Sequence, residues 1–275
     1  MRIELAQLPC RDGDVEHNLA QALAAIERAT PESDLIVFPE TFLSGFPTPD
    51  NVSQLSQPLD GPALSALATA ARARNLSVAI GLAEARDGRY YNTTVLITPQ
   101  GLALSYRKLH MWASDQGVFS AGDRVSSCSW RGLRLGALIC YDIEFPESAR
   151  ALANIGTELL LVTDGNMDPY GPVHRRAIVA RAMENQMFAV LVNRCGSGGC
   201  YRFPGESVVV DPYGEIVAAC GAEAQQLVVD LDLAALQRCR AAYDYRRERR
   251  IELQGLVLDE GASLLSFVIN SGVVD

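Results

Sequence analysis

Residues 133–147 read LRLGALICYDIEFPE, and the fold of the chain can be worked out from this stretch. It begins with an apolar run of strand length, which ends abruptly at polar residues. Pro146 then suits the first turn of a helix over residues 147–154. The stretch therefore predicts a buried strand, a sharp elbow at Cys140 and a helix.

The cysteine at this elbow is open to two interpretations. Backbone N–H groups at a helix start favour a thiolate and the negative charge of an adduct, which makes Cys140 a candidate nucleophile. Free cysteines are also among the most buried residue types, so a structural cysteine is the alternative. The elbow alone does not separate the two.

Composition narrows the class of protein. The chain has 275 residues, of which 48% are hydrophobic and 21% charged, as in a globular protein with a substantial core. Its formal charge of −9 argues against nucleic acid, whose phosphates would be repelled. No apolar run is long enough for a membrane span. Residues 1–10 lack the features of a secretion signal, and the seven cysteines are scattered, so we expect a reduced, cytoplasmic protein.

Outward from the opening stretch, short apolar strands alternate with amphipathic helices. Turn residues at 99–101 and 211–214 predict two antiparallel hairpins. Residues 194–200, which read RCGSGGC, are expected to form a loop, and residues 226–230 the last strand. This order of βα units and hairpins predicts an α/β protein in which two mixed sheets lie between helices.

Three polar residues each follow a predicted buried strand: Glu40, Lys108 and Cys140. Singly, Glu40 reads as a solvated loop acid and Lys108 as a surface lysine. If their strands are neighbours, an acid/base, a cation and a nucleophile meet in one pocket. Acyl transfer needs this set, because the carboxylate takes the thiol proton while the ammonium and a backbone N–H hold the oxyanion.

A papain-like cysteine–histidine pair is the competing arrangement. The chain has three histidines, of which His17 and His174 fall in predicted helices. His110 follows Lys108 by two residues, but no local pattern supports it as a base. The sequence also lacks the GxSxG elbow of serine hydrolases, a Gly-rich phosphate loop and the HExxH motif of metalloproteases.

These motifs resemble the nitrilase superfamily of carbon–nitrogen hydrolases. The segments FPET, YRKLH and LGALICYDIEFPE carry the likeness, which extends over about residues 2–253. The resemblance implies a four-layer αββα sandwich over residues 1–253, built into homodimers or larger homo-oligomers, with no metal or organic cofactor. It implies that Glu40 is the general base and acid, Lys108 the oxyanion partner and Cys140 the nucleophile. The N–H of Tyr141 would complete the oxyanion hole.

Within that superfamily the chain is most similar to the amidase branch. This implies hydrolysis of a small linear carboxamide to carboxylate and ammonia through a thioester on Cys140. A nitrile or an N-carbamoyl amine is the alternative substrate. A binding protein that keeps the pocket without turnover is the alternative of another class.

Further residues have assignments that stay open. Asp115 stands four residues before Phe119, where the family often has a catalytic-site glutamate, and it reads either as a shorter substitute or as a plain loop acid. Asn166 is expected to bind a substrate amide. Glu144 is expected either to recognise an ammonium group or to structure the elbow. The tail, residues 254–275, matches no motif, and its apolar residues predict packing against the domain or a partner subunit.

Overall fold

The computed structural model describes residues 1–251, 253–261 and 263–269. In this part of the chain the strands form two large mixed sheets and a short two-stranded ribbon. The first sheet has the order β14 (Gln225–Asp230), β1 (Arg2–Gln7), β2 (Leu35–Val37), β3 (Ser77–Arg86), β4 (Arg89–Thr98) and β5 (Gly101–Arg107). The second has the order β13 (Ile216–Ala219), β12 (Val208–Val210), β9 (Phe188–Asn193), β8 (Leu159–Asp164), β7 (Leu133–Ile139), β6 (Arg124–Trp130), β16 (Leu264–Ile269) and β15 (Gly255–Asp259).

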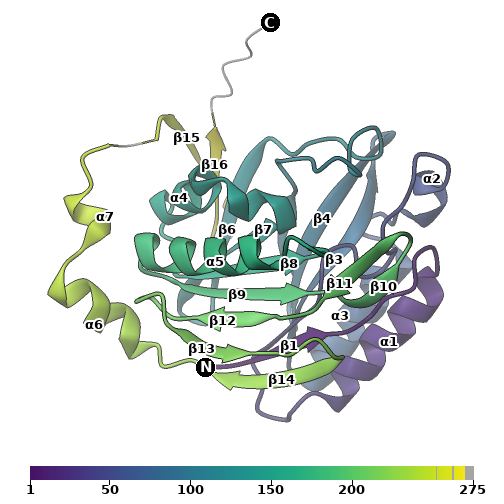
Figure 1. Cartoon of the computed structure of the whole chain (residues 1–275), viewed down its shortest axis with the longest axis horizontal. Helices are drawn as coiled ribbons and strands as arrows, with labels where there is room; N and C mark the ends of the chain where they lie inside the picture. The colour runs from purple at the N-terminus through teal and green to yellow at the C-terminus, as the bar shows by residue number, and fades with distance from the viewer. Residues whose placement is uncertain (252, 262, 270–275) are drawn as a thin grey trace, which may run out of the picture.

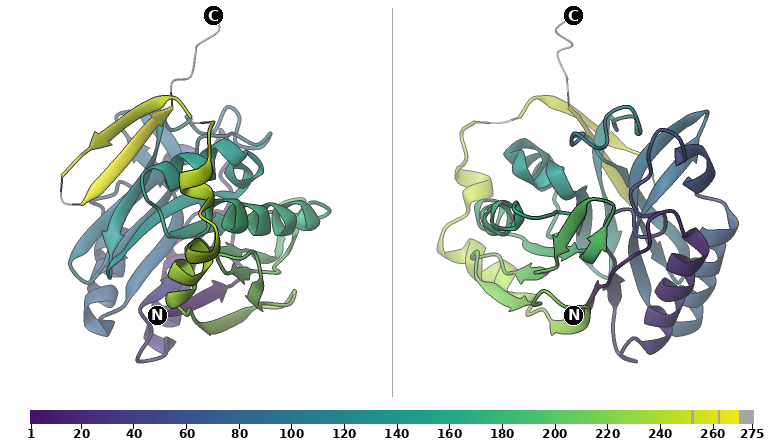
Figure 2. Two further views of the ribbon diagram at one scale, coloured as in Figure 1. Left: turned by 90° about the vertical axis from the view of Figure 1, so that its left-hand side faces the viewer. Right: turned by 45° about the vertical axis from the view of Figure 1, so that its right-hand side comes forward.

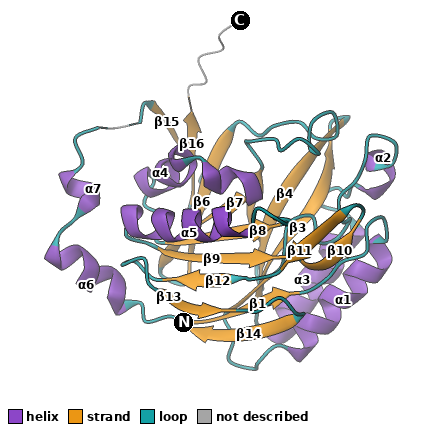
Figure 3. Cartoon of the chain, viewed as in Figure 1, coloured by secondary structure: helices purple, strands orange, loops and turns teal. Residues whose placement is uncertain are grey.

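The two sheets face each other, and helices cover their outer faces (Figures 1 and 2). Helices α1 (Val15–Arg28) and α3 (Pro62–Arg74) lie on the first sheet, and α4 (Pro146–Asn154) and α5 (Gly171–Asn185) on the second. Figure 3 shows this helix–sheet–sheet–helix order, with the short α2 (Val52–Leu55), α6 (Ala234–Ala242) and α7 (Tyr245–Glu248) at the margins. The predicted four-layer αββα sandwich is therefore confirmed.

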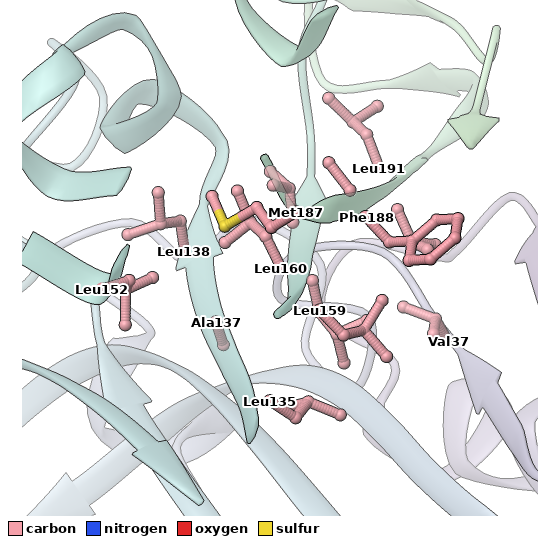
Figure 4. Close-up of a cluster of buried hydrophobic side chains, with 14 of the residues drawn as sticks. Val37, Leu135, Ala137, Leu138, Leu152, Leu159, Leu160, Met187, Phe188 and Leu191 are labelled. Atoms are coloured by element: carbon pink, nitrogen blue, oxygen red, sulfur yellow. The ribbon is translucent and has the colours of Figure 1, made fainter. Parts of the chain in front are cut away.

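The alternation of side chains along a strand explains why both faces of the first sheet are buried. In β2 and the residue after it, Leu35 and Val37 point into the core between the sheets, whereas Ile36 and Phe38 pack with the residues of α1 and α3. Successive side chains in a strand alternate between faces, so a wholly apolar strand suits a sheet covered on both sides. The core between the sheets continues through β7, β8 and β9 (Figure 4).

Two buried hydrogen bonds join the sheets directly. The hydroxyls of Thr94 on β4 and Thr163 on β8 are 2.5 Å apart, and the indole N–H of Trp130 donates to the Ser77 hydroxyl at 2.9 Å. A polar group buried without a partner is costly, so these pairs favour one relative placement of the sheets. That placement matters because both sheets contribute to the site described below.

Two details of the sequence prediction are wrong. The expected loop at residues 194–200 instead begins a hairpin, in which β10 (Cys195–Gly198) pairs with β11 (Tyr201–Pro204) across Gly199 and Cys200. Strand β14 is not the last strand, because β15 and β16 follow it and β16 pairs with β6. A glycine-rich segment, or one that matches no motif, shows little of the apolar alternation that is typical of a strand. Whether it forms a strand therefore depends on its pairing with a neighbouring strand.

Among the described residues, no helix has the length and apolar character needed to cross a membrane.

The tail contributes one core residue that offers a test of its role. Phe267 on β16 is 3% exposed and packs in the core between the sheets, whereas Leu256 on β15 is 56% exposed. We expect Phe267→Ala to lower the free energy of unfolding by about 3–5 kcal/mol in urea titrations, because it opens a cavity. Leu256→Ala is the control, with an expected change within about 0.5 kcal/mol. Removal of residues 255–275 with no change in size or thermal stability would contradict packing of the tail on the domain.

Candidate active site

The predicted elbow at Cys140 is present and strained. Strand β7 ends at Ile139, Cys140 has φ +44°, and a 3₁₀ turn (Cys140–Glu144) leads into α4. A non-glycine residue in this left-handed region costs free energy and is common at functional sites. The neighbouring Gly165 N–H favours the ionised form of the Cys140 sulfur.

A buried carboxylate fastens the Lys108 segment to the elbow. Asp142 accepts from the His110 backbone N–H at 2.9 Å and contacts His110 Nδ1 at 2.8 Å. Its other oxygen accepts from the Tyr106 hydroxyl at 2.7 Å and the Ile139 N–H at 3.2 Å. The His110 ring stacks on Phe145, with the ring centroids 3.8 Å apart, and His110 is not among the described residues that line the cavity of Cys140, which argues against its use as a cysteine–histidine base.

The acid and the cation form one buried network. Lys108 Nζ donates to Glu40 Oε1 at 2.8 Å and to Asp115 Oδ2 at 2.7 Å, and all three side chains are at most 2% exposed. Asn92 also donates to Glu40 Oε1, at 2.7 Å. Among the described residues, buried Glu40 Oε2 has no hydrogen-bond partner, so this oxygen is available to accept a proton.

Gly165 keeps the space beside that oxygen open. A Cβ atom at Gly165 would lie 2.5 Å from Glu40 Oε2 and 2.5 Å from the Phe46 ring. Both contacts are shorter than van der Waals separation. The glycine after β8 therefore lets the two sheets approach closely at the site.

The protonation states follow from burial and charge. Burial raises the pKa of Glu40, although Lys108 opposes this. Burial disfavours the Lys108 charge, but the acidic groups of Glu40, Cys140 and Asp115 around it outweigh burial and raise the pKa of Lys108 well above its ordinary value. Burial, reinforced by the Glu40 charge, raises the pKa of the Cys140 thiol well above its ordinary value. The resting sulfur therefore keeps its proton until a base removes it.

These groups face one cavity of about 360 Å³, which includes its open mouth. Glu40, Lys108, Asp115 and Cys140 line it together. Tyr141, Glu144 and Asn166 also line it, so the structure gathers every sequence-predicted site residue in one place. Aromatic and apolar side chains make up most of the remaining wall: Phe46, Trp112, Met167 and Tyr170.

A second charged cluster, which sequence reasoning missed, adjoins the sulfur. His174 on α5 is 4% exposed; its Nδ1 is 3.0 Å from Asp164 and its Nε2 is 3.2 Å from Glu144. A ring nitrogen of His174, a carboxylate oxygen of Asp164 and the Cys140 sulfur all lie within 4.8 Å of one another. These are atom types that bind metals, but hydrogen bonds to carboxylates engage both ring nitrogens, so the cluster has the character of an ion-pair network.

Other positions that sequence reasoning missed are Asn92, Gly165 and Tyr170, whereas Phe46 and Trp112 belong to loops, residues 43–50 and 112–118, that were expected to shape the pocket. Asp164 is the last residue of the buried strand β8, so the rule that directed attention to polar residues at strand ends could have found it. His174 had no such signal, because helical periodicity alone does not say what the helix covers.

Comparison with known proteins identifies the class to which this fold and site belong. The chain belongs to the carbon–nitrogen hydrolase family, whose model matches residues 2–241. An (R)-stereoselective amidase from Pseudomonas sp. is 52% identical over 256 residues, which span 93% of this chain and 93% of that protein. The predicted family is thereby confirmed, and the predicted amidase activity agrees with this relative.

Two solved structures share the fold. A CN-hydrolase superfamily protein from Xanthomonas campestris, with an arsenic adduct in its active site, has a TM-score of 0.86 and 26% identity, covering 93% of this chain and 99% of its own. A mutant amidase from Nesterenkonia sp. AN1 has a TM-score of 0.81 and 33% identity, covering 91% and 94%. That structure carries the acetamide moiety of fluoroacetamide on its active-site cysteine.

Proposed function

We propose that the chain is a cysteine-dependent amidase that hydrolyses a small linear carboxamide to a carboxylate and ammonia. The observation that supports this best is the shared cavity, in which the Glu40–Lys108–Asp115 network faces Cys140. The proposed roles are general base and acid for Glu40, oxyanion donor for Lys108 and nucleophile for Cys140. Each role suits the burial and charge of its side chain.

The first half-reaction forms the thioester. Glu40 Oε2 takes the Cys140 thiol proton as the sulfur attacks the amide carbon. The negative oxygen of the tetrahedral intermediate is held by Lys108 Nζ and, in this proposal, by the Tyr141 N–H. Glu40 returns the proton to the amide nitrogen, the carbon–nitrogen bond breaks, and ammonia leaves.

The second half-reaction releases the acid. Glu40 removes a proton from a water molecule, whose oxygen attacks the thioester carbon. The carbon–sulfur bond breaks, and the Cys140 sulfur recovers its proton from Glu40. Asp115, which contacts Lys108 at 2.7 Å, is assigned to orienting that ammonium, and Asn166 to binding the substrate amide.

A panel of substrates with one carbon skeleton tests the activity. We expect ammonia release from the primary carboxamide to exceed that from the matching nitrile and N-carbamoyl amine by at least about tenfold. One enantiomer of an α-substituted amide should also react about tenfold or more faster, because a relative that is 52% identical to this chain is an (R)-stereoselective amidase. Thermal stabilisation by all ligands without ammonia release would instead indicate a binding protein.

We also propose that the chain forms a homodimer or a larger homo-oligomer through the outer face of α5. Large apolar side chains are exposed on or beside this helix: Val173, Met183, Tyr213, Tyr243 and Tyr245. A Cβ atom added at Gly214 would lie 3.0 Å from the Met183 side chain, and Gln186 donates a hydrogen bond to the Tyr243 carbonyl at 2.9 Å, so these segments lie side by side. Such a patch is typical of an interface.

Sedimentation equilibrium checks this proposal. We expect Met183→Glu to shift the protein towards monomer, since it would bury a charge at the interface. Leu102→Glu, at a similarly exposed apolar residue on β5 of the other sheet, is the matched control and should leave the mass unchanged. A monomeric unmodified protein would refute the oligomer.

We further propose a cytoplasmic location, which the seven free cysteines support.

A further inference from the structure

His174 is the second buried cation beside the sulfur. It lies between Asp164 at 3.0 Å and Glu144 at 3.2 Å. Burial opposes its charge, but the two carboxylates outweigh burial and raise the pKa of His174 to about 10. The side chain is therefore an imidazolium at neutral pH, with both ring nitrogens donating.

The charge on Asp164 would otherwise oppose the chemistry. Its carboxylate raises the pKa of both Cys140 and Glu40, because a negative charge nearby disfavours a second one. Ionising Cys140 during attack adds a further negative charge to this region. Lys108 is already shared by Glu40 and Asp115, which leaves Asp164 and Glu144 to a different cation.

We propose that His174 is a positioning residue of the reaction: as an imidazolium it neutralises Asp164, holds Glu144 in the cavity wall, and so eases ionisation of Cys140. This inference rests on the proposed function. His174 transfers no proton in it, and its ring stays charged throughout the cycle.

The groups that face His174 come from several elements. Asp164 extends from β8, and Glu144 and Cys140 from the 3₁₀ turn. On the other side, Arg175 of α5 and Glu206, which precedes β12, line a small cavity with His174. The hydrogen-bonded carboxylates of Asp164 and Glu144 are the partners that fix its charge.

Alkylation of Cys140 tests this without turnover. The rate at which iodoacetamide modifies the Cys140 peptide is followed against pH by mass spectrometry. We expect His174→Asn to raise the apparent pKa of alkylation by about 1–3 units, the usual effect of losing a neighbouring opposite charge. Asn keeps a donor for Asp164 but carries no charge. His17→Gln, on α1, is the control and should leave the profile unchanged.

A double variant separates charge from structure. Because the proposed role is to neutralise Asp164, the combination His174→Asn with Asp164→Asn should return the profile towards that of the unmodified protein. A profile unchanged in His174→Asn, or one equally shifted in the double variant, would overturn the inference. If Cys140→Ala abolishes turnover while one of these results is found, the amidase proposal holds and only the role of His174 fails. The two proposals can therefore fail separately.

The unmodified protein gives an independent test. It has three histidines, so the ring resonances of His17, His110 and His174 can be distinguished by NMR with single variants. We expect the His174 ring to stay doubly protonated through pH 8. A neutral His174 ring at that pH would refute the proposed imidazolium, whether or not the variants fold.

Discussion

Cys140→Ala should reduce amide hydrolysis by about four orders of magnitude or more, because it removes the atom that bonds to the acyl carbon. Losses of this size are typical when a covalent nucleophile is deleted. The side chain is small and 8% exposed, so alanine should leave the fold intact. Ammonia release under saturating amide is the measurement, with thermal unfolding as the check on folding.

A second measurement should reveal the covalent thioester intermediate. Rapid acid quenching of the unmodified enzyme should give a protein heavier by one acyl group, located on the Cys140 peptide by mass spectrometry. Cys200→Ala is the matched control, since Cys200 is an exposed cysteine on the β10–β11 hairpin. Full activity in Cys140→Ala, or an acyl group on another residue, would reject the thioester mechanism.

Lys108→Met is expected to have two large effects. Activity should fall by about 10²–10³-fold or more, because the oxyanion loses a preorganised donor. The free energy of unfolding should fall by about 3–5 kcal/mol, because Glu40 and Asp115 remain as buried carboxylates without their shared cation. Steady-state kinetics and urea titration measure the two effects.

A second substitution tells these effects apart. Lys108→Met combined with Asp115→Asn should recover part of the lost stability, since one uncompensated charge is removed, but little of the lost activity. A loss of stability with activity unchanged in Lys108→Met would mean that the lysine is structural only. Recovery of activity in the double variant would contradict a role in oxyanion binding.

Glu40, Lys108 and Cys140 could be predicted because each lies just beyond the end of a strand whose pattern of apolar residues is plain. The reason they meet was predicted less well. Neighbouring strands were the condition for their meeting, whereas Glu40 and Lys108 follow β2 and β5 of one sheet and Cys140 follows β7 of the other. Periodicity identifies a buried face but not what covers it, so the pairing of the two sheets lay beyond the sequence pattern.

His174 illustrates the same limit. On sequence it was one polar residue near the start of a helix, with no spacing that linked it to Cys140. Its role depends on α5 packing beside the 3₁₀ turn that carries Glu144, which is a contact between segments 30 residues apart. Residues that act through a tertiary ion pair leave no local pattern, whereas those at strand ends do.

Because the site is divided between two sheets, the rate of catalysis should depend sensitively on the relative position of the two sheets. A small shift of one sheet against the other would move Glu40 away from Cys140 even if every helix and strand stayed folded. Inactivation on heating should then precede the loss of circular dichroism. Variants that retain turnover at higher temperature would be enriched in substitutions that strengthen contacts between the two sheets, such as those around Thr94 and Thr163.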